Sequence, residues 1–298
     1  MRILLALIVW LSLAAPVASR PDNAVPLGYS ADGHLVVPVY INASGPYAFI
    51  LDSAASRTVI STRLATELTL PLLPNRVGRL VGASGETTTQ VYRVDALRFA
   101  GQQWTLAAAL ALPAAPTPTE AGYAGILGLD VLTTQPLLFD FKGRKLAFLS
   151  AEEAQHIRRD RRWHKIWARR NFAGFLSVNL RINGRRVRAI IDSGARRSIG
   201  NEKLGALLDG LSPASILVRE QIITGVALPQ VPARTGLART VKLQSLRWDE
   251  AEILVADLAV FEALGLNRQP ALILGLDFLQ STSGVVFDFS RQRLWIKP

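Results

Sequence analysis

Two aspartates stand at matching places in two similar stretches of the chain. Asp52 ends the apolar run in "FILDSAASRTVIS", residues 49–61, and Asp192 ends the run in "AIIDSGARRSIG", residues 189–200. A carboxylate can act as a general acid or as a general base, so both residues are candidates for catalysis. An aspartate followed by serine at a strand end is more often a turn or cap residue, and neither stretch alone argues for more.

Three sequence blocks recur in the same order in the two halves of the chain. Besides the aspartate stretches they are the pair "GILGLDVL" (125–132) and "LILGLDFL" (272–279), and the pair "LLFDFKGRKLAFL" (137–149) and "VVFDFSRQRLWIK" (285–297). The copies are 140 residues apart at Asp52 and Asp192, and 148 apart at Asp140 and Asp288. Three blocks in register indicate a tandem duplication with small loop insertions.

Each copy has the pattern of a small all-β domain. The stretches "HLVVPVYI" (34–41) and "FLSVNLRI" (175–182) are β-branched and partly alternating, and turn residues follow each of them. A short helix is expected after each aspartate strand, with Ser61 and Asn201 as N-caps. The fold class predicted is therefore all-β, with two β-barrel domains related by pseudo-twofold symmetry and a few short helices.

The chain divides into four segments. Residues 1–19 combine a positive start, an apolar run and small residues before Arg20, which is the order of a secretory signal peptide. An uncleaved N-terminal membrane anchor is the alternative for this segment. The first domain is expected over residues 20–150, a basic linker over 151–171 and the second domain over 172–298. The sequence thus predicts an exported protein, periplasmic or secreted after cleavage near Ser19.

Composition excludes several kinds of chemistry. The chain has no cysteine, which excludes disulfides, thiolate catalysis and cysteine metal sites. It has three histidines and neither an HExxH nor a GxSxG motif, so zincin and serine-hydrolase chemistry have no support. No metal and no cofactor are expected.

Positive charge is concentrated in the second half. The formal net charge is +11, and much of the excess lies in "HIRRDRRWHKIWARR", residues 156–170. This segment is either a solvated connector, the reading we favour, or a contact with an anionic envelope surface. A nucleic-acid partner is not expected, because the chain is exported and carries no recognisable nucleic-acid-binding motif.

The repeated motifs resemble those of the retropepsin and pepsin superfamily of aspartic peptidases, particularly bacterial retropepsin-like proteins. The family signature places two apolar residues before Asp-Thr/Ser-Gly-Ala/Ser/Thr and adds a later apolar-apolar-Gly. Asp192-Ser193-Gly194-Ala195 and Ile273-Leu274-Gly275 match it fully, as does Ile126-Leu127-Gly128. Asp52-Ser53-Ala54-Ala55 departs only at Ala54.

This resemblance implies a catalytic pair formed by Asp52 and Asp192. Two carboxylates a hydrogen bond apart share one proton, and the ionised one activates a water while the protonated one donates to the scissile carbonyl; aspartic proteases are the standard example. The resemblance assigns Ser53 and Ser193 to bracing the two loops, and Ala54 and Gly194 to supporting the pair. Asp130, Asp140, Asp277 and Asp288 are expected to be structural.

Glycine-rich segments are candidates for flaps over a substrate. Gly82 and Gly85 mark such a hairpin in the first half, and Gly225 marks its counterpart in the second. The sequence does not distinguish one flap from two, or a flap from an ordinary hairpin.

Two classes of function follow from these features. The first is an endopeptidase whose dyad lies within one chain, a monomer acting on a protein or peptide substrate. The second is an inactive relative that binds an extended peptide or an envelope partner, because Ala54 replaces the family glycine. In a variant of the first class only the second half is catalytic and two chains pair through it.

Overall fold

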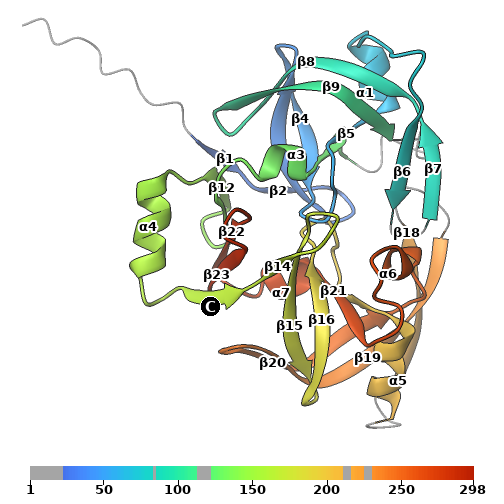
Figure 1. The fold of residues 1–298 in the computed structure, drawn as a ribbon, viewed down its shortest axis with the longest axis vertical. Helices are drawn as coiled ribbons and strands as arrows, with labels where there is room; N and C mark the ends of the chain where they lie inside the picture. Colours follow the sequence, from blue (N-terminus) through green and yellow to red (C-terminus); the bar gives the residue numbers. More distant parts are fainter. Residues whose placement is uncertain (1–22, 83–84, 113–121, 211–215, 225–229) are drawn as a thin grey trace, which may run out of the picture.

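The computed structural model describes residues 23–82, 85–112, 122–210, 216–224 and 230–298. These residues form two closed β-barrels in tandem, one above the other in Figure 1, as the sequence predicted. The predicted signal segment, residues 1–19, lies outside the described part. None of the helices in the described ranges is long and apolar enough to cross a membrane.

The first barrel closes through six strands. They follow the order β3-β4-β10-β5-β9-β8, and β3 pairs with β8 to complete the ring, with the short β2 added to the outside of β3. The elements of this barrel are β2 (Gly28–Tyr29), β3 (Leu35–Ile41), β4 (Ser44–Leu51), β5 (Val59–Ser61), α1 (Thr62–Glu67), β8 (Val91–Phe99), β9 (Gln102–Leu112), β10 (Gly125–Leu127) and α3 (Leu129–Leu132).

The second barrel repeats this topology. Its ring follows β15-β16-β21-β17-β20-β19 and closes between β15 and β19, while β14 lies outside β15 as β2 lies outside β3. Its elements are β14 (Arg169–Arg170), β15 (Leu176–Ile182), β16 (Arg185–Ile191), β17 (Ile199–Gly200), α5 (Glu202–Asp209), β18 (Ile216–Thr224), β19 (Gln230–Leu243), β20 (Leu246–Val255), α6 (Ala259–Ala263), β21 (Ala271–Leu274) and α7 (Leu276–Leu279).

The predicted start signals of the two helices are confirmed. The Ser61 hydroxyl accepts a hydrogen bond from the Leu64 amide at 3.1 Å, which caps α1. The Asn201 side chain accepts from the Leu204 amide at 2.9 Å and caps α5. Local chemistry therefore ends the strand and begins the helix at the same place in both copies.

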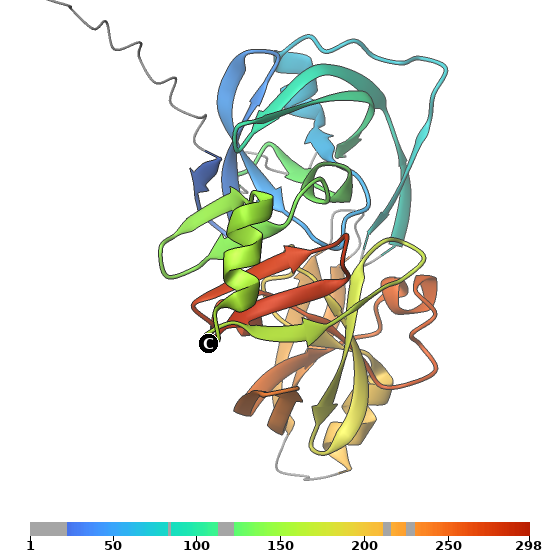
Figure 2. The ribbon, with the colours of Figure 1, turned by 60° about the vertical axis from the view of Figure 1, so that its left-hand side comes forward.

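A third sheet joins the two barrels. It contains six strands in the order β1-β12-β11-β22-β23-β13, so each half of the chain contributes to it. Figure 2 shows the red pair β22–β23 beside the green strands between the barrels, with α4 across one side. Its strands and helix are β1 (Ala24–Pro26), β11 (Leu137–Asp140), β12 (Lys145–Phe148), α4 (Ala151–Arg159), β13 (His164–Trp167), β22 (Gly284–Asp288) and β23 (Arg293–Lys297).

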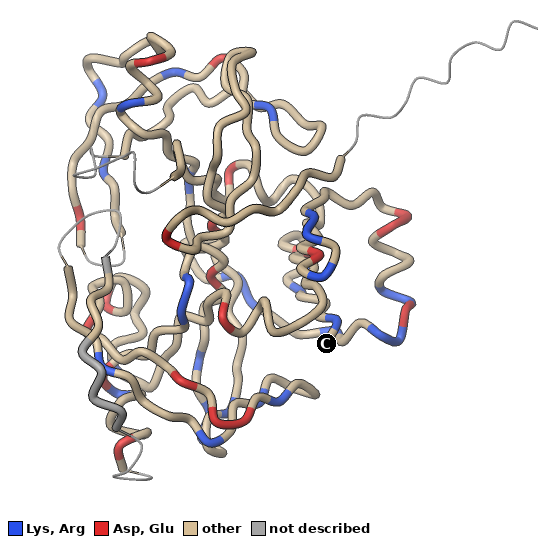
Figure 3. Tube along the Cα trace, turned by 180° about the vertical axis from the view of Figure 1, so that it is seen from behind, with Lys and Arg blue, Asp and Glu red and all other residues tan. Residues whose placement is uncertain are grey.

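The segment predicted as a basic linker is part of this joining layer. Helix α4 begins at a capping box formed by Ser150 and Glu153, and carries acidic residues in its first turn and basic ones in its last, as its dipole favours. Both groups are visible along α4 in Figure 3. Strand β13 then pairs with β23, and Ile166 in it is fully buried. The connection between the domains is therefore packed against both of them.

Two phenylalanines from the repeated Phe-Asp-Phe blocks meet at the centre of the joining sheet. The rings of Phe139 and Phe287 are 4.9 Å apart, and both side chains are almost fully buried. Strands β11 and β22 that carry them pair antiparallel. This contact holds the two halves of the chain together away from the aspartates.

We expect Phe287→Ala to lower the free energy of unfolding by about 3–5 kcal/mol, because it leaves a cavity in the joining sheet. Chemical denaturation followed by fluorescence measures this change. The matched control is Phe172→Ala, because the Phe172 side chain is 80% exposed. An equal cost for the two variants would contradict the role given to this contact.

Candidate active site

The structure brings Asp52 and Asp192 together at the junction of the two barrels. Asp52 follows β4 and Asp192 follows β16, and the two carboxyl groups lie close enough for each to influence the pKa of the other. A Cβ atom placed on Gly194 would lie 2.5 Å from Cγ of Asp52. Glycine is therefore required at position 194 for Asp52 to reach its partner.

The two carboxyls are not equivalent. Oδ1 of Asp192 accepts from the amides of Gly194 at 2.7 Å and Ala195 at 3.1 Å, whereas Oδ1 of Asp52 accepts from the amide of Ala54 at 2.7 Å. Burial and then the charge of Asp192 raise the pKa of Asp52 well above its usual value. Burial also raises the pKa of Asp192, and backbone amides oppose the rise at both residues, those of Gly194 and Ala195 at Asp192 and those of Ala54 and Ala55 at Asp52. Two buried carboxyls of this kind hold one proton between them.

Ser53 and Ser193 connect the two aspartate loops through four reciprocal hydrogen bonds. Each hydroxyl accepts from the backbone amide of the other serine at 3.0 Å. Each also donates across the junction, Ser53 to the carbonyl of Ile191 at 3.0 Å and Ser193 to that of Leu51 at 2.9 Å. Because both serines are buried, these bonds fix the spacing of the residues next to each aspartate.

The Ile-Leu-Gly segments support the aspartate loops from behind. The amide of Asp52 donates to the carbonyl of Leu127, and that of Asp192 donates to the carbonyl of Leu274. A Cβ on Gly128 would lie 2.4 Å from the backbone of Arg57, and one on Gly275 would lie 2.7 Å from that of Ala195. Both glycines therefore allow this close packing behind the aspartate loops.

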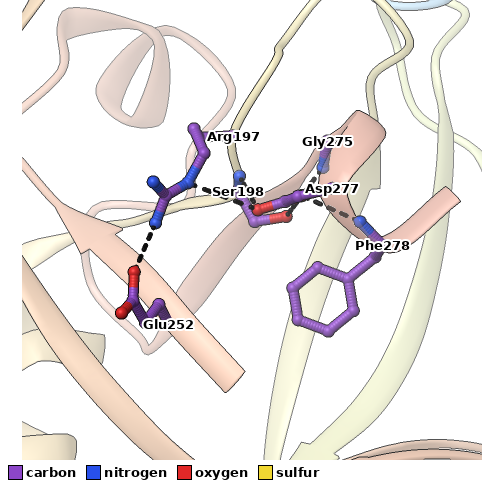
Figure 4. Close-up of polar contacts among 6 residues, drawn as sticks. All are labelled: Arg197, Ser198, Glu252, Gly275, Asp277 and Phe278. Carbon is purple, nitrogen blue, oxygen red and sulfur yellow. Dashed lines mark hydrogen bonds and ion pairs between the residues drawn. The ribbon is translucent and has the colours of Figure 1, made fainter. Parts of the chain in front are cut away.

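Asp277 has a structural role, as expected (Figure 4). It accepts hydrogen bonds from the amide and hydroxyl of Ser198 and from the amide of Phe278, at 2.7–2.9 Å. The Ser198 hydroxyl also accepts from the Gly275 amide at 2.9 Å, and Arg197 links Asp277 to Glu252. Burial raises the pKa of Asp277 in spite of these donors. Asp277 therefore ties the end of the aspartate loop to the start of α7.

Asp130 does the same in the first barrel. Its Oδ1 accepts from the amide of Thr58 at 2.8 Å and from its hydroxyl at 2.7 Å, and the Thr58 hydroxyl accepts from the Gly128 amide. Asp140 and Asp288 accept backbone amides three residues ahead and shape turns. The two aspartates at the junction, Asp52 and Asp192, are therefore the candidate dyad, and the other four aspartates of the repeats hold local structure.

Comparison with known sequences agrees with this geometry. A family model described as aspartyl protease matches residues 37–131 and 178–278, which is more than half of the chain. The chain belongs to this aspartyl protease family. The predicted resemblance and the predicted tandem fold are therefore confirmed. Among curated proteins, no match was found.

Ala54 fits the aspartyl protease site without distorting it. Its amide holds Asp52 at 2.7 Å, the same distance at which the Gly194 amide holds Asp192. Ala54 has none of the positive φ that would demand glycine. The strict need for a small residue falls on Gly194, because only one of the two loops has to admit the opposing carboxyl at this distance.

Each barrel extends a hairpin on the same side of the molecule, and the two hairpins run toward each other in Figure 1. The first consists of β6 (Gly78–Gly82) and β7 (Gly85–Thr89), where Gly82 pairs with Gly85, and β6 contacts α6 of the other barrel. The second is formed by β18 and β19, whose last pair is Thr224 with Gln230. Gly225 lies outside the described residues. A flap role for these hairpins stays a prediction.

Sequence reasoning missed a polar turn beside the dyad. The Arg196 guanidinium donates to the carbonyl of Asp32, and Nδ1 of His34 lies 2.9 Å from Oδ2 of Asp32. Burial acts to raise the pKa of Asp32, but the Ser30 hydroxyl, His34 and Arg196 lower it below its usual value. The available signal was the Asp-Gly turn at 32–33 ahead of the strand, together with an arginine four residues after Asp192.

We expect Ser53→Ala and Ser193→Ala each to cost about 1–3 kcal/mol of stability, because each leaves buried groups without hydrogen-bond partners. The double variant should cost less than the sum, since the two hydroxyls act on the same set of bonds. Equilibrium unfolding of the four proteins in this cycle measures the coupling. Ser56→Ala, an exposed serine in the same loop, is the control and should change little. Strictly additive costs would contradict a mutual brace.

We expect Asp52→Asn to stabilise the protein near neutral pH. The pKa of Asp52 is raised in the folded state, so the wild type loses stability as pH rises from the unfolded value of 3.8 through the folded one. The variant has no carboxyl to titrate at this position and avoids this loss. Its free energy of unfolding should exceed that of the wild type by roughly 1.4 kcal/mol for each unit by which folding raises the pKa of Asp52. Thermal unfolding at a series of pH values should show a gain that disappears below pH 3.8. Asp95→Asn, at an exposed position, is the matched control for the substitution itself; an unchanged or lowered Tm for Asp52→Asn at neutral pH would contradict the shared proton.

Proposed function

We propose that the protein is an aspartic endopeptidase that hydrolyses peptide bonds with a water activated by Asp52 and Asp192. The observation that carries this proposal is the pair of interacting carboxyls on two loops that the reciprocal bonds of Ser53 and Ser193 join. Membership of the aspartyl protease family supports the same chemistry. The substrate is a protein or peptide.

The asymmetry of the pair assigns the two roles. Asp192, whose Oδ1 accepts two amides, is the ionised member and takes a proton from the attacking water. Asp52 holds the shared proton and donates it to the carbonyl oxygen as the water oxygen bonds to the carbonyl carbon. The tetrahedral intermediate then breaks at the C–N bond, and the amine leaves with a proton passed through the carboxyls. The raised pKa of Asp52 keeps this proton in place above the ordinary range of an aspartate.

The working unit is proposed to be a single chain. Ser53 contacts Ser193 within the same molecule, which supports a monomer with an internal pseudo-dimer over a pair of chains. The inactive-binder alternative depended on Ala54, and the intact Ala54 bond to Asp52 gives it no support. We further propose that the protein is exported to the periplasm or secreted after cleavage near Ser19. An anionic envelope surface then remains a candidate partner for the basic residues of 156–170.

We expect Asp52→Asn and Asp192→Asn each to abolish proteolysis nearly as completely as the double variant, because the two carboxyls act as a unit. Purified protein is incubated with denatured casein and a peptide library, with and without pepstatin, and cleavage is quantified by mass spectrometry. Asp95→Asn, an exposed aspartate on β8, is the matched control and should retain full activity.

Three results would contradict the proposal. Full activity of Asp52→Asn in a sample shown to be monomeric would exclude the intramolecular pair. Activity that needs Asp192 alone and falls steeply on dilution would indicate pairing of two chains. A wild-type protein that binds peptides and never cleaves them would support the alternative of an inactive peptide-binding relative.

A further inference from the structure

The second barrel has a basic groove on its outer face. The groove is a cavity of about 510 Å³ formed by β14, the outer faces of β15 and β16, and the segment after α6. Ile190 and Leu266 give it an apolar floor. Its polar and aromatic rim consists of Trp167, Arg169, Arg170, Asn179, Arg188 and Arg293.

The cations of this rim lack acidic partners. None of the described residues that line the groove is an aspartate or glutamate, and the exposed side chains of Arg169 and Arg188 make no ion pair in the described part of the chain. Arg293 lies over the ring of Trp167 at 3.6 Å, yet 57% of Trp167 remains exposed. Unpaired guanidinium groups around an apolar floor are suited to carboxylates.

An unused donor lies beside these arginines. Asn171, also on the wall of the groove, accepts the amides of Ala173 and Phe175 through Oδ1, which fixes the orientation of its side chain. Its Nδ2 is buried and has no hydrogen-bond partner in the described structure. A buried donor left unpaired is costly, and an acceptor from a ligand would remove that cost.

The fold does not require the positive charge at this face. In the second barrel Arg169 pairs with Ser177, and Asn179 pairs with Arg188. The same strands of the first barrel place Gly28 opposite Val36 and Pro38 opposite Ala48. The two copies therefore build the same sheet with and without cations, so a role in folding alone does not explain Arg169 and Arg188.

The groove lies along the strand that ends at the catalytic pair. Side chains two positions apart along a strand point to the same face. Arg188 and Ile190 therefore share one face of β16 and its extension with Asp192. Four residues of strand place Arg188 about 13 Å from Asp192, at roughly 3.3 Å per residue. A substrate chain held at the dyad reaches this distance with about four extended residues of its own.

We propose that the basic groove binds an acidic segment of the protein substrate, a few residues from the bond that is cleaved. This inference rests on the proposed peptidase function for the statement that the ligand is a substrate chain. The negative charge of the ligand is inferred from the groove itself. Glutamate or aspartate side chains of the substrate pair with Arg169 and Arg188, and its apolar side chains contact Ile190 and Leu266. The groove then selects substrates by sequence outside the immediate cleavage site.

Binding can be tested without cleavage in the full chain carrying Asp52→Asn. A labelled peptide rich in glutamate and leucine is compared with a twin in which every glutamate is glutamine, and fluorescence anisotropy gives Kd at physiological ionic strength. We expect the acidic peptide to bind at least about tenfold more tightly, roughly the factor supplied by one charge-assisted hydrogen bond. Arg169→Gln with Arg188→Gln should remove this preference. Arg63→Gln with Arg98→Gln changes the net charge equally at exposed positions of the first barrel and should keep it.

The remaining outcomes would overturn the proposal. The first is equal affinity for the two peptides. The second is a first-barrel control that loses the preference for the acidic peptide as fully as the groove variant does. The third is binding of phosphatidylglycerol vesicles through Arg169 and Arg188 in preference to the peptide. Failure of the peptidase function is recognised separately, because wild-type protein would then leave casein intact while the acidic peptide still bound through the groove. Cleavage that proceeds normally with no acidic preference would reject the groove alone.

Discussion

The structure depends on holding two carboxyl groups in contact although each belongs to a different barrel. Like charges at this distance do not both ionise, so the contact is stable only with a proton between them. Two devices make the approach possible. Gly194 leaves room where a methyl group would meet Asp52, and the serine that follows each aspartate bonds to the opposite loop. The aspartates themselves are therefore placed by backbone that is fixed from both sides.

Duplication of one domain supplies both sides of this arrangement. Each half brings one strand that ends at an aspartate, one Ile-Leu-Gly segment behind it and one strand pair for the joining sheet. Phe139 and Phe287 then hold the halves together at a distance from the site. The copies differ where symmetry is not needed for the pair. The first copy has Ala54 where the second has Gly194. The polar turn of Asp32 and His34 occurs in the first half, and the arginines of the basic groove occur in the second.

Much of the fold could be predicted because its signals are local and occur twice. The N-caps of α1 and α5, the strands that end at Asp52 and Asp192, and the structural role of Asp277 all follow from short motifs. The pairing of β13 with β23 could not be predicted, because the charged run that contains β13 favours an exposed connector. The contact of Arg196 with Asp32 was missed for a similar reason, since it joins residues 164 positions apart. The groove arises only when β14, β15 and the segment after α6 come together.

The most direct test of the shared proton is a titration of the two aspartate carboxyl carbons by ¹³C NMR, with Asp52→Asn and Asp192→Asn used to assign the signals. The structure predicts that the pair holds a single proton over a broad range of pH, that Asp52 releases it well above the usual aspartate value, and that removing Asp192 lowers the pKa of Asp52. Two signals that titrate independently at about pH 3.9, unaffected by the partner's replacement, would contradict a pair that shares one proton.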